Sequence, residues 1–159
     1  MEQLPSKRVR DSYTEQVQIL TQGAMNGFCR LFGGQLMQWI DIVAGVVARR
    51  HSGRNVTTAV VDSLEFLAPA HANDTIILTG AISYAGRTSM EVCVRTYVEA
   101  LSGERQLITT AYMVMVALGE DERPAPVPGL ILETDEERRE WENALRRNAL
   151  RRQRRVEQF

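Results

Sequence analysis

The stretch Asn26–Arg50, NGFCRLFGGQLMQWIDIVAGVVARR, joins a glycine-containing loop to a long and nearly all-apolar segment. At about 100° per residue, the apolar side chains of this segment fall on one line of an α-helix and extend onto one flank. We therefore expect a helix that is buried on most sides. Asp41 lies at the margin of its apolar surface. A desolvated carboxylate costs free energy unless it is paired, so Asp41 is either a satisfied structural acid or a functional group.

Two glycines, Gly33 and Gly34, stand where this helix should begin. Glycine lets a substrate approach the backbone closely, and the free N–H groups of a helix N-terminus suit a developing oxyanion. The ordinary alternative is a tight turn into the helix. Asn26 lies in the preceding loop, where asparagine is normally a turn residue. Backbone donors with Asp41 two turns further on would flank a carbonyl, which is the layout that acyl transfer requires.

Most of the remaining chain up to residue 118 consists of strand-like runs, at residues 11–20, 55–67, 75–84, 88–100 and 104–118. The connections between the last four are short and rich in turn residues, so we expect consecutive strands to form antiparallel hairpins. One helix against about five antiparallel strands defines an α+β fold. One helix cannot cover both faces of such a sheet, and a bare edge strand invites association. We therefore expect a homo-oligomer, most simply a dimer that extends the sheet.

The two ends of the chain are polar. We expect residues 1–10 to be a flexible arm, residues 11–120 to be a single domain, and residues 121–159 to be a Pro-rich linker with a charged helix. Thr134 and Glu137 form the pattern of a capping box at the start of that helix. Acids crowd its start and arginines its end, in the order that the helix dipole favours. Such charge runs favour a solvent-exposed helix.

Composition narrows the classes of function. The chain has 159 residues and a net charge of −1, which fits one globular domain. Its N-terminal residues lack the apolar core of a secretory signal, and no apolar run approaches the ~20 residues that span a bilayer, so we expect a cytoplasmic protein without membrane contact. Cys29 and Cys93 form no metal-ligand spacing, so free thiols and no metal are expected. The basic segment at residues 146–155 lacks the folded basic patch with aromatics that nucleic-acid binding favours.

A candidate phosphate site follows the glycine at residue 86. Arg87, Thr88 and Ser89 begin a strand there, and a guanidinium with two hydroxyls and free N–H groups could hold phosphate. The alternative is an ordinary hairpin end. His51 and His71 have no acid or cysteine at ligand spacing, so both are interpreted as surface or capping residues.

The pattern N-x-x-x-x-L-F-G-G-Q-L-M-x-W-x-D, from Asn26 to Asp41, resembles the hot-dog-fold acyl-CoA thioesterases of the cytosolic acyl-coenzyme A thioester hydrolase family. The resemblance continues through residues 56–66, 86–92 and 127–137, and it covers roughly residues 11–145. Two positions depart from the pattern: Cys29 stands where many relatives have glycine, and Phe32 where some have histidine. With Phe32 at the helix start, a substrate carbonyl would depend on backbone N–H groups.

The resemblance implies a long helix wrapped by a curved antiparallel sheet, and a homodimer with two active sites at its interface. Such dimers commonly assemble further as trimers of dimers. It also implies that Asp41 activates water or attacks the thioester, and that Asn26 contributes to a site across the interface. Finally, it implies that four residues lie near the pantetheine and phosphates of CoA: Gly86, Arg87, Thr88 and Ser89.

The expected function is hydrolysis of acyl-CoA to a free fatty acid and CoA, with no cofactor beyond the CoA of the substrate. Asp41 would act as general base or as a nucleophile through an anhydride, Gly33 and Gly34 would offer backbone N–H groups, and Asn26 would hold the water or the substrate. Two rival functions stay open: a non-catalytic acyl-CoA-binding regulatory module on the same fold, and RNA binding through the arginine-rich C-terminus. A hot-dog dehydratase or hydratase is disfavoured, because no histidine partners Asp41 in the nearby sequence.

Overall fold

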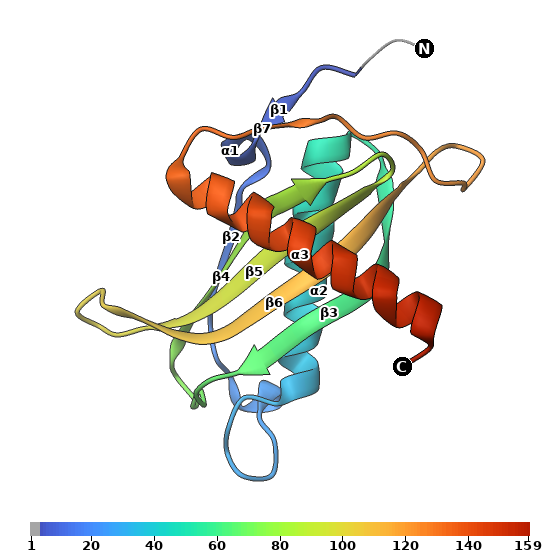
Figure 1. Cartoon of the computed structure of the whole chain (residues 1–159). Coiled ribbons are helices and arrows are strands. Elements are labelled where there is room, and N and C mark those ends of the chain that lie inside the picture. The colour runs from blue at the N-terminus through green and yellow to red at the C-terminus, as the bar shows by residue number, and fades with distance from the viewer. Residues whose placement is uncertain (1–3) are drawn as a thin grey trace.

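A long helix, α2 (Gly33–Ser52), packs against a five-stranded antiparallel sheet in the computed structural model, which describes residues 4–159 (Figure 1). The strands follow the order β2-β4-β5-β6-β3 across the sheet. This arrangement confirms the α+β prediction of one long helix and five strands. The strand bounds are β2 Thr14–Ile19, β3 Asn55–Phe66, β4 Thr75–Ala85, β5 Ser89–Glu99 and β6 Arg105–Leu118.

The core lies between α2 and the inner face of the sheet. Ile40, Val43 and Val47 of α2 are completely or almost completely buried. A methyl group at Gly80 of β4 would come within 2.7 Å of Val43 and 2.8 Å of Val47, so this glycine permits the close approach of helix and sheet. Gly53, with a φ of 66°, caps the helix in the left-handed conformation.

One side of α2 departs from the prediction of burial on most sides. Met37 is 44% exposed and Ile42 is 50% exposed. The reason is the width of the sheet: β3 is its last strand on this side, so nothing within the chain covers the helix beyond it. The long edge strand β3 is itself largely exposed, and Val60 and Phe66 are among its exposed apolar side chains.

The connection between β3 and β4 corrects the expectation that all consecutive strands form hairpins. β4–β5 and β5–β6 are antiparallel neighbours, but β3 pairs with β6 while β4 pairs with β2 and β5. Residues 67–74 therefore cross one end of the sheet. Backbone bonds hold this crossing: Leu31 N–H donates to the Ala70 carbonyl, and Asn73 N–H donates to the Leu20 carbonyl. An extended chain covers about 3.3 Å per residue and neighbouring strands lie about 4.8 Å apart, so this connection is long enough to pass two intervening strands.

The N-terminal residues that the structure describes were expected to form a flexible arm, but several of them pair with other parts of the chain. Strand β1 (Lys7–Arg8) pairs in parallel with β7 (Leu130–Ile131), and a helical turn, α1 (Val9–Ser12), follows it. A short 3₁₀ turn, η1 (Gln22–Ala24), precedes the loop before α2. The other part of the predicted arm, residues 1–3, lies outside the described residues. No helix of the described residues is long and apolar enough to cross a membrane.

His51 is fully buried, which corrects its interpretation as a surface or capping residue. Its Nε2 lies 2.9 Å from the Pro128 carbonyl, where it donates a hydrogen bond as the N–H tautomer. This bond ties the last turn of α2 to the linker that precedes β7. Burial lowers the pKa of His51, and the nearby Lys7 acts in the same direction.

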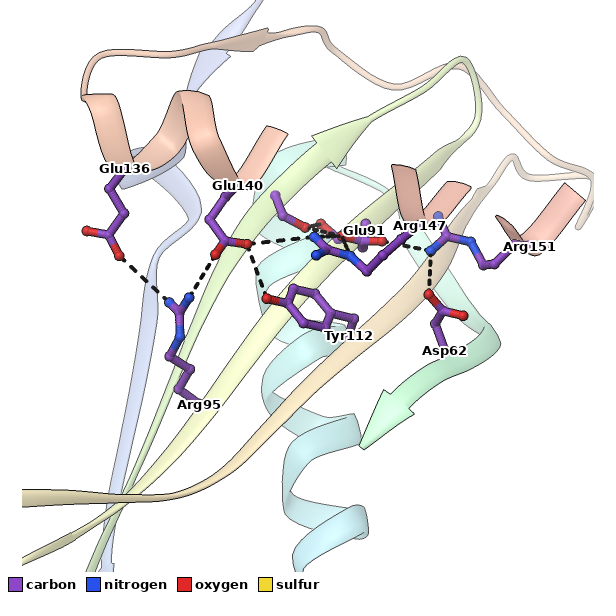
Figure 2. Close-up of polar contacts among 9 residues, drawn as sticks. Asp62, Glu91, Arg95, Tyr112, Glu136, Glu140, Arg147 and Arg151 are labelled. Carbon is purple, nitrogen blue, oxygen red and sulfur yellow. Dashed lines mark hydrogen bonds and ion pairs between the residues drawn. The ribbon is translucent and has the colours of Figure 1, made fainter. Parts of the chain in front are cut away.

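The C-terminal helix, α3 (Asp135–Glu157), lies diagonally across the outer face of the sheet (Figure 1). Thr134 and Glu137 form the predicted capping box at its start. The prediction of a solvent-exposed helix is wrong for one face, where Ala144 and Arg151 are buried. Arginines on this face of α3 pair with acidic side chains of the sheet beneath it (Figure 2). One charged face of α3 therefore contacts the sheet. The sequence pattern alone could not distinguish this face from a solvent-exposed one.

Candidate active site

Asp41 makes a short hydrogen bond across to the edge strand. The Thr58 hydroxyl of β3 donates to Oδ1 of Asp41 at 2.5 Å. Asp41 is exposed in the single chain, which corrects the expectation of a desolvated carboxylate. It projects on the side of α2 where the sheet ends, so solvent reaches it. The bond orients one carboxylate oxygen, and the other accepts no hydrogen bond from residues 4–159.

Two β-bulges follow Thr58 in β3 and shape the wall beside Asp41. In the pairing of β3 with β6, register shifts fall between Thr58 and Val60 and again between Val61 and Ser63. Each shift adds one residue to β3 and reverses the alternation of its side chains beyond that point. Consequently residues three apart share the inner face of the sheet: Thr58, Val61 and Leu64 pair with Met115, Met113 and Ala111 of the core.

A small apolar pocket of about 300 Å³ adjoins the carboxylate. Its walls come from the first half of α2, from β3 and from β6, and are formed by Gly34, Met37, Gln38, Ile40, Asp41, Val61, Leu64 and Met113. A strand without bulges would alternate strictly and would not bring Val61 and Leu64 to one wall. The pocket therefore combines an apolar lining with one carboxylate and one glycine from the start of a helix.

The glycine pair forms the first residues of α2, and does not form a tight turn ahead of it. Aromatic rings explain why side chains are absent here. A methyl group at Gly34 would lie 2.7 Å from the Phe32 ring, and one at Gly33 would lie 3.3 Å from the Phe66 ring. Phe32 is the N-cap and its side chain makes no capping hydrogen bond, so the first N–H groups of α2 stay available to an acceptor.

Asn26 shapes the loop in front of α2. Its Oδ1 accepts hydrogen bonds from the backbone N–H groups of Phe28 at 2.9 Å and Arg30 at 3.2 Å. An amide oxygen has two acceptor positions, and both are used here, which leaves the Nδ2 donors for other partners. Asn26 does not line the Asp41 pocket of its own chain. The loop it closes projects from the body of the molecule, with Phe28 88% exposed (Figure 1).

The four predicted CoA-binding residues share a second pocket, of about 290 Å³, at the turn between β4 and β5. Gly86 N–H donates to the Ser89 carbonyl and closes this turn. The opposite wall comes from α3, whose contribution to this site no sequence pattern indicated. The lining consists of Tyr84, Gly86, Arg87, Thr88, Ser89, Asn148, Arg152 and Arg155.

The structure thus unites some of the predicted site residues and leaves others apart. Asp41 and Gly34 line one pocket, and residues 86–89 line another. Thr58 and the arginines of α3 were missed. Thr58 lies in an unremarkable β-branched run, and it stands out only once β3 is placed beside α2. The arginines carried a basic-charge signal, but nothing in their spacing indicates which of them face the turn at Gly86.

Comparison with known proteins agrees with the fold and with the motif around Asp41. Residues 30–101 match the model of the thioesterase superfamily. A Bacillus subtilis protein named as an uncharacterized acyl-CoA thioester hydrolase is 42% identical over 113 residues, which are 70% of this chain and 66% of that protein. The match therefore spans slightly less than two thirds of that relative's length.

Solved structures are similar over almost the whole chain. An acyl-CoA hydrolase from Staphylococcus aureus, in complex with butyryl coenzyme A, coenzyme A and coenzyme A disulfide, has a TM-score of 0.93 and 33% identity, covering 97% of this chain and 94% of that one. A hexameric acyl-CoA thioesterase has a TM-score of 0.91 and 37% identity, covering 95% and 97%.

A helix held in a curved five-stranded sheet, with a carboxylate at the edge of an apolar pocket, defines a hot-dog-fold protein of the thioesterase class. The chain belongs to the thioesterase superfamily, and its relatives are named acyl-CoA thioester hydrolases. This finding confirms the family that the motif from Asn26 to Asp41 indicated.

Proposed function

We propose that this protein hydrolyses the thioester of acyl-CoA, releasing a free fatty acid and CoA. The observation that carries the proposal is the Asp41–Thr58 hydrogen bond at the mouth of an apolar pocket beside an uncapped helix start. The pocket suits an apolar acyl chain. The backbone N–H groups at Gly33 and Gly34 polarise the thioester carbonyl, and donors aimed at a developing oxyanion are a large source of rate enhancement.

Asp41 acts on the carbonyl carbon by one of two routes. As general base it removes a proton from water, whose oxygen adds to the carbonyl carbon while the carbon–sulfur bond breaks; the CoA thiolate then takes the proton. As nucleophile its carboxylate forms an anhydride that water cleaves, with the same products. A single turnover in H₂¹⁸O tests the anhydride route. Label in the protein carboxylate after turnover indicates that water cleaved an anhydride at the Asp41 carbonyl; label only in the fatty acid is expected when water attacks the acyl carbon, in the thioester or in the anhydride.

Thr58 and Asn26 complete the proposed machinery. Variants of the Staphylococcus aureus hydrolase that were made for structural study replace an asparagine, an aspartate and a threonine by alanine. The intervals between those three positions equal the intervals between Asn26, Asp41 and Thr58 in this chain. Thr58 holds the Asp41 carboxylate in one orientation. Asn26 offers its Nδ2 donors to the substrate carbonyl or to the attacking water.

The site is completed by a second copy of the chain. The edge strand β3 and the adjoining side of α2 leave apolar side chains exposed near Asp41, among them Met37 and Ile42 of the helix. Pairing of two β3 edges would cover both and would extend the sheet. Asn26, which does not line the Asp41 pocket of its own chain, then serves the partner's site. Three such dimers give a hexamer, the assembly named for one structural relative.

The deciding experiment measures thiol release from a panel of acyl-CoA chain lengths by the protein and by Asp41→Asn. The proposal expects turnover with at least one chain length and its loss in the variant. Binding without turnover at every chain length would contradict it and would favour an acyl-CoA-binding module. Mixed oligomers of Asn26→Ala and Asp41→Ala test the shared site, because mixing should restore part of the activity that each parent lacks.

A further inference from the structure

The arginines of α3 divide into two sets with different surroundings. Arg147, Arg151 and Arg154 follow the spacing i, i+4, i+7 and therefore share one flank of the helix. All three pair with acids of the sheet: Arg147 and Arg151 bind Glu91, and Arg151 and Arg154 bind Asp62. Figure 2 shows Arg147 and Arg151 reaching toward these carboxylates from the helix above the sheet. The charge of this flank is compensated.

The second set has the same spacing, displaced by one residue, and faces the turn between β4 and β5. It consists of Asn148, Arg152 and Arg155, and all three line the pocket at Gly86. Arg87 approaches from the other wall. No carboxylate lies within 4 Å of Arg87, Arg152 or Arg155 among residues 4–159, and no acidic side chain lines the pocket. Three positive charges therefore meet without a counter-charge from the chain.

Hydroxyl and amide groups accompany these charges. Thr88, Ser89 and Tyr84 bring hydroxyls to the pocket, and Asn148 brings an amide. Guanidinium groups bind phosphate through paired N–H donors, and hydroxyls or amides can satisfy the remaining phosphate oxygens. The mutual repulsion of the arginines falls when a polyanion neutralises them. The pocket is thus suited to a ligand that carries more than one phosphate and exposes them on a flexible chain.

We propose that Arg152 and Arg155 of α3, together with Arg87, form a clamp for the phosphates at the nucleotide end of the CoA substrate. The identity of the ligand rests on the proposed function. The clamp gives the arginine-rich helix a role, whereas the family resemblance implied none for it. The compensated flank fixes α3 on the sheet, and the uncompensated flank binds substrate. The clamp acts on binding, since it is separate from the Asp41 pocket.

The test compares substrates that differ only at the nucleotide end: an acyl-CoA, the matching acyl-3′-dephospho-CoA and the matching acyl-pantetheine. For Arg152→Gln/Arg155→Gln, we expect KM for acyl-CoA to rise about tenfold or more, because charge-assisted hydrogen bonds are lost, while kcat stays within about twofold. KM for acyl-pantetheine should be equal in variant and parent. A smaller effect with acyl-3′-dephospho-CoA than with acyl-CoA would assign the clamp to the 3′-phosphate, and equal effects would assign it to the pyrophosphate.

A matched control removes the same charge from the same helix. Arg139 and Arg146 are exposed, line no part of the pocket, and make no ion pair within the described residues. Arg139→Gln/Arg146→Gln should leave KM for acyl-CoA within about twofold of the parent. Similar rises in both double variants would show a general field effect of net charge and would overturn the clamp.

Calorimetric titration with CoA and with pantetheine gives a readout that does not require turnover. If the clamp binds CoA, we expect CoA to bind the Arg152→Gln/Arg155→Gln variant about tenfold more weakly than it binds the parent, with a smaller difference at high salt. Unchanged CoA affinity would overturn the clamp, even if acyl-CoA is hydrolysed. Binding of CoA through the clamp without hydrolysis of any acyl-CoA would instead contradict the proposed reaction alone. Loss of RNA affinity with unchanged CoA affinity would overturn the clamp in favour of a nucleic-acid surface.

Discussion

The guanidinium of Arg151 lies 2.8 Å from the carboxylate of Glu91, and the two side chains are only 8% and 1% exposed. The same guanidinium reaches Asp62 at 2.9 Å. Asp62 is the extra residue of the second bulge in β3, and the bulge turns it outward toward α3. One arginine of the C-terminal helix therefore links the central strand β5 to the bulged part of the edge strand β3, which bounds the Asp41 pocket.

Glu91 is the centre of this network, since it also accepts from Arg147 at 2.7 Å and from the Ser83 hydroxyl at 2.7 Å. Glu91→Gln keeps the shape but removes the charge that compensates two arginines. Breaking a buried pair from one side is costly, and we expect the free energy of unfolding to fall by about 3 kcal/mol in urea denaturation. Arg138→Gln is the control, because its pair with Asp135 is exposed; it should cost less than about 1 kcal/mol. Equal losses in the two variants would contradict a buried role for Glu91.

Thr58 offers a direct test of the site. Thr58→Val removes the hydroxyl that donates to Asp41 but keeps a β-branched side chain in the strand. Hydrogen bonds to charged groups contribute about 1.5–3 kcal/mol, so we expect kcat for acyl-CoA hydrolysis to fall roughly 10- to 100-fold. Thr58→Ser retains the hydroxyl and should stay within a few-fold of the parent. If the two variants were equally impaired, packing of the methyl group and not the hydrogen bond would be the cause.

His51 makes the stability of the fold depend on pH. Burial lowers its pKa below 6.5 in the folded protein, so the unfolded chain takes up a proton at a higher pH than the folded chain does. The contribution of neutral His51 is complete above pH 6.5 and is lost as the pH falls from there toward the folded pKa. His51→Gln keeps a donor near the Pro128 carbonyl but cannot titrate. Between pH 7.5 and 5.5, the parent should lose more free energy of unfolding than this variant; parallel losses would contradict the assignment.

Most helices and strands of the fold could be predicted from local patterns in the sequence. The apolar lines of α2, the β-branched strands and the capping box at Thr134 are local signals, and each has a local physical cause. The β3 bulges could not be predicted, because a bulge is defined by the register against β6, which is distant in sequence. Thr58 was missed because its bond to Asp41 depends on how β3 lies beside α2. The packing of α3 on the sheet could not be predicted either, because its partners are also distant in sequence. Its acids and arginines satisfy the pattern of a solvent face until Glu91 and Asp62 are placed beneath them.

The two cysteines should differ sharply in reactivity. Cys29 is exposed in the loop that Asn26 closes, with a left-handed φ of 57°. Cys93 is buried in β5, and burial raises the pKa of its thiol to about 11, so its thiolate is scarce at neutral pH. Titration of the native protein with a thiol reagent should therefore detect Cys29 rapidly, and Cys93 only after denaturation.

Cys29→Gly should remove the rapid thiol without loss of stability, because glycine adopts the left-handed conformation freely. The variant also lacks the background reaction that Cys29 would add to a thiol-release assay with acyl-CoA. Rapid modification that persists in Cys29→Gly would mean that Cys93 is reached from solvent, and the packing of α3 over β5 would then be looser than its ion pairs indicate. The thiol titration is thus also a probe of how firmly α3 is held on the outer face of the sheet.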